Sequence, residues 1–595
     1  MSIRDTPRGG GPADPWVPLT ILAALAAAAG ALAALTLGGG LASLVTGHGW
    51  HSPYSWALLG AAVRGDLARI WPGVPTGLIL AFAAVLGAAA LVGVFFAVRA
   101  IRRRVPDRND PARHLAGPAD VAHLTTPVLA EAALNLRPSL AGQSAEDLDP
   151  DECGALLGRL RPNGPELRRN LEDVELAIMA PRSFKTSAYA IPRVLAAKGA
   201  CVVTSRRADV WQATAAYRAK HTKGPILVFD PQRIAHHPQE WWWNPLEGID
   251  NVEDAGRLAQ HFVAGVADER AREIWGPAAR ALLSELILAA ALDNRSLDDV
   301  FGWLVDTSTG VPATILERHP QFKNMARNYR ARQAGADETT QGIYETARSG
   351  AACLRDPRIM AWVTKPSRPM QRLNLRHFVR STGTFYLMSH KGAGSAAPLV
   401  AALTDSLFRE AMRAAEAMGG RLDPSMDVIL DEAANVCPIG DLPDLYSYLG
   451  GAGINVLTIL QSIKQGESVW GETGMEMLWG ASTIKIIGAG IDDANLASDL
   501  ARLIGDHDVP TRSVTRTRDG WSVSDSPRRQ QIMSAADIRA LRKGTALLLA
   551  TGTPVAMVDL LPYFKHHPER ELIAELEHKA KQQVQQWAAA SYAGG

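Results

Sequence analysis

The sequence predicts an α/β protein in which a mainly parallel sheet is interrupted by an all-helical insertion and preceded by two N-terminal transmembrane helices. Three observations lead to this fold class. Two long segments near the N-terminus carry no charge, strand-like and helix-like runs alternate on both sides of a helix-rich stretch, and an apolar run ends at the paired carboxylates Asp431 and Glu432. A chain of 595 residues also exceeds what one hydrophobic core holds, so several packed units are expected.

The membrane segments are residues 19–45 and 70–98, which contain no charged side chain. Each is longer than the roughly 20 apolar residues that span a bilayer. Five arginines follow the second segment: Arg99, Arg102, Arg103, Arg104 and Arg108. The loop between the segments has only Arg64 and Arg69 beside Asp66. Because arginine stays on the cytoplasmic side, we expect a multi-pass protein with both termini cytoplasmic. A cleaved signal peptide before a buried alanine-rich helix is the alternative.

The alternation of strand and helix begins near Glu175 and is typical of βαβ units in a parallel sheet. Strands are expected at 175–180, 200–204, 225–230, 384–389, 427–431, 454–461 and 482–488, with a last pair within 546–558. Helices are expected at 187–197, 210–221 and 492–504. Between these halves the pattern is nearly all helical, which indicates an inserted domain.

The expected organisation follows from these boundaries. It comprises a cytoplasmic N-terminal tail (1–18), a membrane anchor with two helices (19–104), a linker (105–170), a first part of the α/β domain (171–246), the all-helical insertion (247–380), a second part of the α/β domain (381–565) and a C-terminal tail helix (566–595). The tail helix is charged and glutamine-rich, so we expect it to be exposed.

The net charge and the cysteine content argue against some kinds of binding site. A formal net charge of +1 gives no general attraction to nucleic acid, so any DNA contact must be local. The 4 cysteines are scattered without CxxC spacing. This fits a reducing compartment and argues against a disulfide or zinc framework.

Three polar residues follow apolar strand runs: Asp431 and Glu432 after Val428–Leu430, and Gln461 after the next run. Because ligands sit at the carboxyl ends of parallel strands, these side chains should share one edge of the sheet. Phosphoryl transfer needs a carboxylate for hydrated Mg²⁺, a second polar group to activate water and often a sensor on the neighbouring strand. Asp431, Glu432 and Gln461 would fill these roles in that order. An acidic pair that merely caps a helix is the plainer alternative.

A phosphate-binding loop is expected at MAPRSFKT, residues 179–186, between a strand and a helix. The motif GxxxxGK[ST] cradles phosphates with backbone N–H groups, a lysine and a hydroxyl. Lys185 and Thr186 are present, but Met179 and Phe184 replace both glycines. We expect strain of about 1–3 kcal/mol and weaker phosphate binding, and we expect restored glycines to strengthen it. The residues expected to contact a nucleotide are Ala180, Pro181, Arg182, Ser183, Phe184, Lys185, Thr186 and Ser187. A lysine that only begins a helix is the alternative for Lys185.

Several motifs occur together in one order: APRSFKTSAYAIP, YRAKHTKGPILVFDP, WNPL, GTFYLMSHK, DEAAN, GDLPDLYSYLGGAGI, LTILQS and GTALLLATGTPV. With the anchor before them, they resemble the TraG/TraD-like conjugative DNA-transfer ATPases, the coupling proteins of type IV secretion. The resemblance covers roughly residues 170–565 and the anchor.

The resemblance implies a RecA-like P-loop motor in the inner (plasma) membrane that forms a homohexamer. It implies ATP and Mg²⁺ as cofactors, and as partners DNA or a relaxase–DNA complex and the components of a secretion channel. Lys185 would bind the β- and γ-phosphates, and Thr186 and Asp431 would hold Mg²⁺. The chain departs from the family pattern at Gly450–Gly453, where Ala452 stands at a position that often carries arginine. Arg182 or Arg502 could replace that arginine.

An arginine-rich segment near the C-terminus is the candidate DNA contact. Arg512, Arg516 and Arg518 lie close to Trp521, a mixture that binds phosphate backbone and stacks on bases. An exposed, soluble loop is the equal alternative. For the whole chain, the alternatives to a DNA-pumping ATPase are a receptor for secretion cargo with a degenerate nucleotide site, and an FtsK-like DNA translocase.

Overall fold

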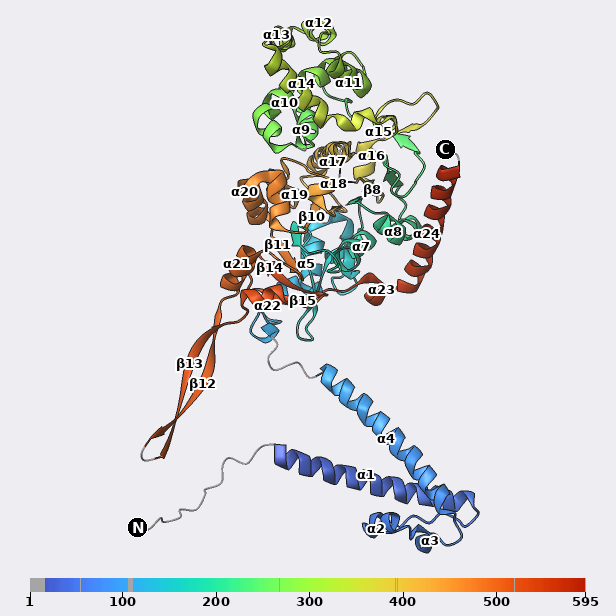
Figure 1. Ribbon diagram of the computed structural model, residues 1–595. Helices are drawn as coiled ribbons and strands as arrows, with labels where there is room; N and C mark the ends of the chain where they lie inside the picture. The colour runs from blue at the N-terminus through green and yellow to red at the C-terminus, as the bar shows by residue number, and fades with distance from the viewer. Residues whose placement is uncertain are drawn as a thin grey trace. The chain divides into compact units, whose positions relative to one another are not determined.

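The computed structural model describes residues 16–53, 55–104, 111–266, 268–390, 392, 394–517 and 520–593. The chain divides into two compact units, Met1–Asp110 and Pro111–Gly595 (Figure 1). Each unit is described by itself.

The first unit is built on two long helices, α1 (Trp16–Val45) and α4 (Thr76–Arg104), joined through the short α2 (Ala57–Arg64) and α3 (Leu67–Ile70). The helices approach closely at Gly38, where a Cβ would lie 2.6 Å from the backbone nitrogen of Ala83. The stretches Ala26–Val45 and Thr76–Phe96 are long and apolar enough to cross a membrane. Exposed apolar side chains along α4, such as Leu91 and Phe95, fit such surroundings.

The second unit contains an 11-stranded sheet in the order β2-β1-β15-β14-β11-β3-β10-β9-β4-β8-β5. Its strands are β1 (Leu156–Leu160), β2 (Glu166–Arg168), β3 (Glu175–Ile178), β4 (Cys201–Ser205), β5 (Ile226–Phe229), β8 (Thr384–Met388), β9 (Met426–Leu430), β10 (Ile454–Leu460), β11 (Ile484–Gly488), β14 (Thr545–Ala550) and β15 (Ala556–Asp559). The seven strands from β11 to β5 are parallel, and the other four are antiparallel to their neighbours. The predicted α/β sheet is confirmed.

Helices cover both faces of the sheet because its strands carry apolar side chains on both sides. Leu176 and Ile178 of β3 join one core, and Ala177 joins the other. The first core includes α17 (Ala397–Ala417), α19 (Leu442–Leu449) and α20 (Ile463–Ala481). The second includes α7 (Ile191–Ala196), α8 (Asp209–His221) and α24 (Arg570–Ala593). Near-continuous apolar strands buried on two faces are what a parallel sheet requires.

The helical insertion begins after the short β6 (Trp241–Trp242), which pairs in parallel with β7 (Gln371–Arg372) on the return. Between them lie α9 (Val252–Ala264), α10 (Glu269–Leu292), α11 (Leu297–Val305), α12 (Val311–Glu317), α13 (Lys323–Gln333), α14 (Asp337–Gly350) and α15 (Pro357–Val363), and α16 (Leu375–Val379) follows β7. A third stretch long and apolar enough for a membrane, Arg270–Leu292, lies in α10 and is largely buried among these helices. The Trp241 ring packs on Trp362, with centroids 5.0 Å apart, and so joins the insertion to the sheet.

The expected linker at 105–170 has short helices up to Cys153, but it is wrong at its C-terminal end. Residues 156–168 form β1 and β2, and β1 pairs with β15, whose residues lie almost 400 positions later. Buried ion pairs fix this segment, among them Arg169 Nη2 to Asp427 Oδ1 at 2.6 Å. β1 pairs with a distant segment and β2 has only three residues, so neither leaves a local periodic pattern to recognise.

The expected tail helix is present as α24, but it is exposed on one side only. One side of α24 packs on α8, with Ile573 fully buried and the Trp587 ring 5.8 Å from that of Trp211. The hydroxyl of Tyr217 also donates a 2.6 Å hydrogen bond to Glu569 at the start of this segment. The sequence of α24 is dominated by the charged residues of its outer face, so its narrow apolar stripe was not recognised from the sequence.

The arginine-rich segment forms a two-stranded antiparallel ribbon, β12 (Asp506–Thr517) and β13 (Gly520–Gln531), which projects from the unit (Figure 1). The sequence pattern predicts no strands here. Arg512 and Arg516 belong to β12 by their backbone, but their side chains are outside the described part, and Arg518 lies outside the described residues altogether.

Candidate active site

The expected site residues meet at one edge of the sheet because three neighbouring parallel strands end there. In the sheet, β10 lies between β3 and β9, with Leu460 opposite Ile178 and Thr458 opposite Leu430. The Met179 N–H donates to the Leu460 carbonyl at 2.9 Å, which places the start of the 179–186 loop at the end of β10. Asp431 and Glu432 leave β9 at the same edge.

The loop keeps a left-handed residue where the motif has its second glycine. Phe184 has φ 72° and ψ 15°, and it directly precedes the π-helical turn η4 (Lys185–Ala190), which continues into α7. Arg182 also has a positive φ, 64°. Within the loop, Ser183 Oγ donates to the Ala180 carbonyl at 2.6 Å. The backbone path that a glycine would allow is therefore adopted despite a bulky side chain.

Contacts of the Phe184 ring offset the strain of this conformation. The ring packs beside Gly544, where an added Cβ would come within 3.6 Å of it. Lys543 Nζ lies 4.3 Å from the ring centroid, and the Phe564 ring lies 6.5 Å away. The half-buried ring also packs against the second core. These contacts stabilise the left-handed backbone at Phe184, which a glycine would adopt without strain.

Met179 differs from the expectation. It is fully buried and is not among the residues with positive φ. Its side chain fills the space over Gly488, where an added Cβ would lie 3.0 Å from Met179 Cγ. Met179 therefore carries no left-handed strain, and the expectation of strain at this position is wrong.

Lys185 connects the loop to both carboxylates. Its Nζ lies 3.2 Å from Asp431 Oδ1 and 3.0 Å from Glu432 Oε1. Thr186 Oγ1 donates to Asp431 Oδ2 at 3.4 Å, and Thr204 Oγ1 donates to the Asp431 carbonyl at 3.1 Å. The expected lysine, hydroxyl and carboxylates thus form one cluster.

The two carboxylates differ in electrostatic environment. Burial raises the pKa of Asp431, although the charge of Lys185 opposes this. Burial also acts to raise the pKa of Glu432, but Lys185 and Arg206 outweigh it and lower that pKa. Glu432 therefore stays ionised near neutral pH, while Asp431 is a carboxylate that a cation would stabilise.

Arg206 is a site residue that the sequence analysis missed. It follows β4, and its Nη1 donates to Glu432 Oε2 at 3.0 Å. The rule that located Asp431, polar residues at the carboxyl ends of parallel strands, also applies to Arg206 and could have found it.

Gln461 follows β10 at the same edge and is half-buried. Its backbone N–H donates to Gln465 Oε1 at 2.8 Å. The cluster of Lys185, Asp431 and Glu432 forms without its side chain.

The candidate arginines occupy different places. Arg182 is exposed on the 179–186 loop, whereas Arg502 lies on α21 (Ala494–Ile504) and pairs with Asp499. The loop containing Ala452 precedes β10 and so lies at the opposite edge of the sheet, where Arg421 donates to the carbonyl of Gly451 at 3.2 Å.

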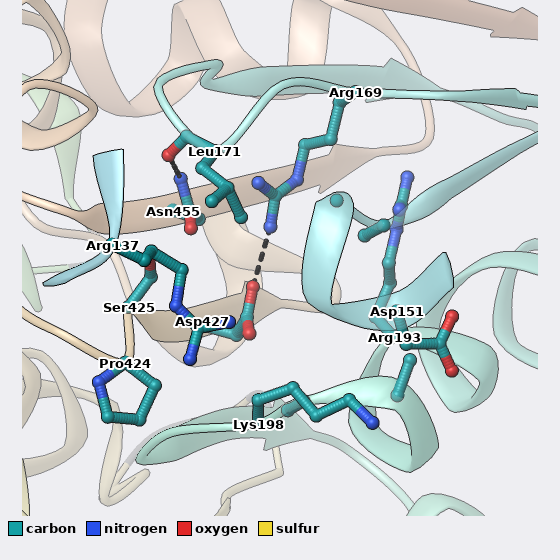
Figure 2. Close-up of a pocket in the computed structure, with 14 residues that line it drawn as sticks. Arg137, Asp151, Arg169, Leu171, Arg193, Lys198, Pro424, Ser425, Asp427 and Asn455 are labelled. Carbon is teal, nitrogen blue, oxygen red and sulfur yellow. Dashed lines mark hydrogen bonds and ion pairs between the residues drawn. The ribbon is translucent and has the colours of Figure 1, made fainter. Parts of the chain in front are cut away.

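A cavity of about 20 Å³ lies at that opposite edge. Figure 2 shows the side chains that line it, which include Arg169, Arg193, Asp427 and Asn455. Arg193 pairs with Glu175 at 2.7 Å, and Arg169 pairs with Asp427. Because Asp427 and Asn455 belong to the starts of β9 and β10, this network secures the sheet and is separate from the lysine–carboxylate cluster.

Comparison with known proteins decides the family. Residues 174–591 match the family described as type IV secretory system conjugative DNA transfer, which is more than half of the chain. The protein belongs to this conjugative DNA-transfer family. The resemblance drawn from the sequence is confirmed.

Relatives of the conjugative DNA-transfer family include two conjugal transfer proteins TraG from Escherichia coli. One is 26% identical over 336 residues, covering 52% of this chain and 50% of the relative. The other is 24% identical over 331 residues with the same coverage, 52% and 50%. The chain thus spans about half the length of the curated relatives it matches. Among solved structures, the bacterial conjugative coupling protein TrwBdeltaN70 in its unbound form has a TM-score of 0.50 at 18% identity, covering 68% of this chain and 89% of that one. This likeness supports the fold.

Proposed function

We propose that the protein is a membrane-anchored, ATP-driven coupling protein that recruits DNA or a DNA–protein substrate and pumps it into a type IV secretion or conjugation channel. The observation that carries the proposal is the bridge from Lys185 to Asp431 and Glu432 at the end of the central strands, in a member of a conjugative DNA-transfer family. A relaxase–DNA complex, the channel components and further copies of the chain in a hexamer are the proposed partners.

The residues of the cluster fit ATP and Mg²⁺. The Thr186 hydroxyl and the Asp431 carboxylate lie together, and such oxygens are the ligands that Mg²⁺ prefers. A cation there also relieves the cost of the buried Asp431 charge. ATP supplies the phosphoanhydride bond that is broken.

Each residue of the cluster has one role in this proposal. The backbone of Ala180–Ser187 and the Lys185 ammonium bind the phosphates, and Thr186 with Asp431 holds Mg²⁺. Glu432, ionised and fixed between Lys185 and Arg206, orients and activates the attacking water. Gln461 follows β10, the strand that lies between β3 and β9, and it senses the terminal phosphate.

We propose that α1 and α4 anchor the protein in the inner membrane with both termini in the cytoplasm. Two observations support this: the apolar stretches Ala26–Val45 and Thr76–Phe96, and the arginines that follow the second stretch. We further propose that the β12–β13 ribbon contacts DNA through Arg512, Arg516 and Arg518.

A cargo receptor with a degenerate nucleotide site remains the second candidate, because Phe184 and Met179 replace both motif glycines. Equilibrium titration of the full chain in detergent micelles with labelled ATP and Mg²⁺ separates the two. Saturable binding that Lys185→Ala abolishes and the control Lys198→Ala preserves supports the motor. Lys198 is suited as the control because it pairs with Asp149, outside the cluster. A folded protein that binds no ATP would favour the receptor.

A further inference from the structure

An aromatic surface lies beside the phosphate loop, on the side away from the carboxylates. It consists of Phe184, Phe564 and Lys543, and we call it the aromatic shelf. The two rings are 6.5 Å apart, and Lys543 Nζ lies 4.3 Å from the Phe184 centroid. Phe564 is 44% exposed, so part of its ring is open to solvent beside the loop.

Antiparallel pairing brings the distant parts of the shelf to the loop. Because β14 runs antiparallel to β11, with Ala546 opposite Gly488, its first residues lie at the edge where β3 and β11 end. β15 then returns to the same edge, and the Leu560 N–H donates to the Gly544 carbonyl at 2.8 Å. The next helix, α23 (Tyr563–His566), carries Phe564 and lies against η4.

The two sides of the loop differ in chemistry. Lys185 extends toward Asp431 and Glu432, which follow β9, on one side of β3 in the sheet. Phe184 extends toward Gly544 and Lys543, which precede β14, on the other side. A triphosphate whose terminal phosphate lies near the carboxylates therefore has its nucleoside end on the side of the shelf.

We propose that the aromatic shelf binds the purine base of the nucleotide by stacking on Phe564, with Phe184 supporting that ring from the loop. The inference rests on the proposed nucleotide-binding function. Stacking on an aromatic face depends on ring surface more than on hydrogen bonds, so the shelf accepts adenine and guanine alike. The proposal also explains the aromatic residue at the glycine position, because the side chain that strains the loop forms part of the base site.

The test compares ligands with and without a base. The full chain in detergent micelles is titrated with ATP and with inorganic tripolyphosphate, both with Mg²⁺, by calorimetry. Phe564→Ala should weaken ATP binding about tenfold and leave tripolyphosphate binding within about twofold. Phe564→Trp should restore ATP binding. Tyr592→Ala, which removes a 93% exposed aromatic on α24, is the matched control and should change neither.

Three results would overturn the inference in different ways. Unchanged ATP binding by Phe564→Ala would place the base elsewhere while the proposed function stands. Equal weakening of ATP and tripolyphosphate would mean that Phe564 only supports the loop or an interface with a second copy. A folded wild-type chain that binds neither ligand would contradict the proposed function itself, and the shelf with it.

Discussion

Lys543 Nζ lies 4.3 Å from the centre of the Phe184 ring, although the two residues are more than 350 positions apart in the chain. The contact joins the start of β14 to the 179–186 loop. It also shows how a phenylalanine with φ 72° persists at a position that usually requires glycine. A cation over an aromatic face contributes about 0.5–1 kcal/mol at an exposed site, the same order as the strain of a left-handed residue.

The balance of strain and ring contacts predicts an unusual order of stabilities. Phe184→Gly relieves the strain and loses the ring, so the free energy of unfolding should change by less than about 1 kcal/mol. Phe184→Ala loses the ring but keeps the strain and should cost roughly 1 kcal/mol more. Met179→Gly should destabilise by about 3 kcal/mol, because it empties a fully buried site. Denaturant unfolding measures all three, and an alanine variant as stable as the glycine variant would show that no strain exists.

The ionised Asp431 should lower the free energy of unfolding, although the proposed Mg²⁺ site needs its charge. Burial raises its pKa, so the folded chain holds the proton more tightly than the unfolded chain, and ionisation costs stability as the pH rises above the ordinary value of 3.8. Asp431→Asn should therefore raise Tm at pH 7 without nucleotide, and the gain should shrink as the pH falls. Asp508→Asn, which removes an exposed carboxylate of β12, is the control. A lower Tm for Asp431→Asn would show that the bridge to Lys185 outweighs burial.

The anchor predicts a labelling pattern. All four native cysteines are free and buried, so each can be replaced by alanine to give a silent background. In that background, Ser55→Cys, in the loop between the two apolar stretches, should react with a membrane-impermeant thiol reagent on intact cells. Ser591→Cys, near the C-terminus, should react only after lysis. Labelling of the second site on intact cells would invert the topology.

DNA binding through the β12–β13 ribbon predicts a specific salt dependence. The logarithm of the affinity should fall linearly with the logarithm of salt concentration. Replacing Arg512, Arg516 and Arg518 by alanine should flatten that slope by up to about three units, one for each lost phosphate contact. Fluorescence anisotropy with labelled DNA provides the slope. If the slope stays the same, the ribbon is not the DNA contact.

The sequence predicted those parts of the site that depend on local pattern. Buried parallel strands are short apolar runs, and their carboxyl ends identify themselves by the polar residues that follow, as at Asp431 and Glu432. It did not predict the contact of Phe184 with Lys543 and Phe564, because antiparallel return strands bring those residues together over a long distance in the chain. It also missed β1 and β2, because β1 pairs with the distant β15 and β2 is only three residues long. Arg206 was overlooked although the same rule covers it.

The most direct test of the proposed motor is steady-state ATP hydrolysis by the full chain in lipid nanodiscs, with Mg²⁺ and DNA. The wild-type protein and the control Lys198→Ala should hydrolyse ATP. Lys185→Ala and Glu432→Gln should lose on the order of 10²-fold or more in kcat, and Glu432→Gln should still bind ATP because it keeps Lys185, Thr186 and Asp431. Turnover that survives Lys185→Ala, or a folded wild-type protein without turnover, would contradict the claim that this cluster drives an ATP-dependent motor.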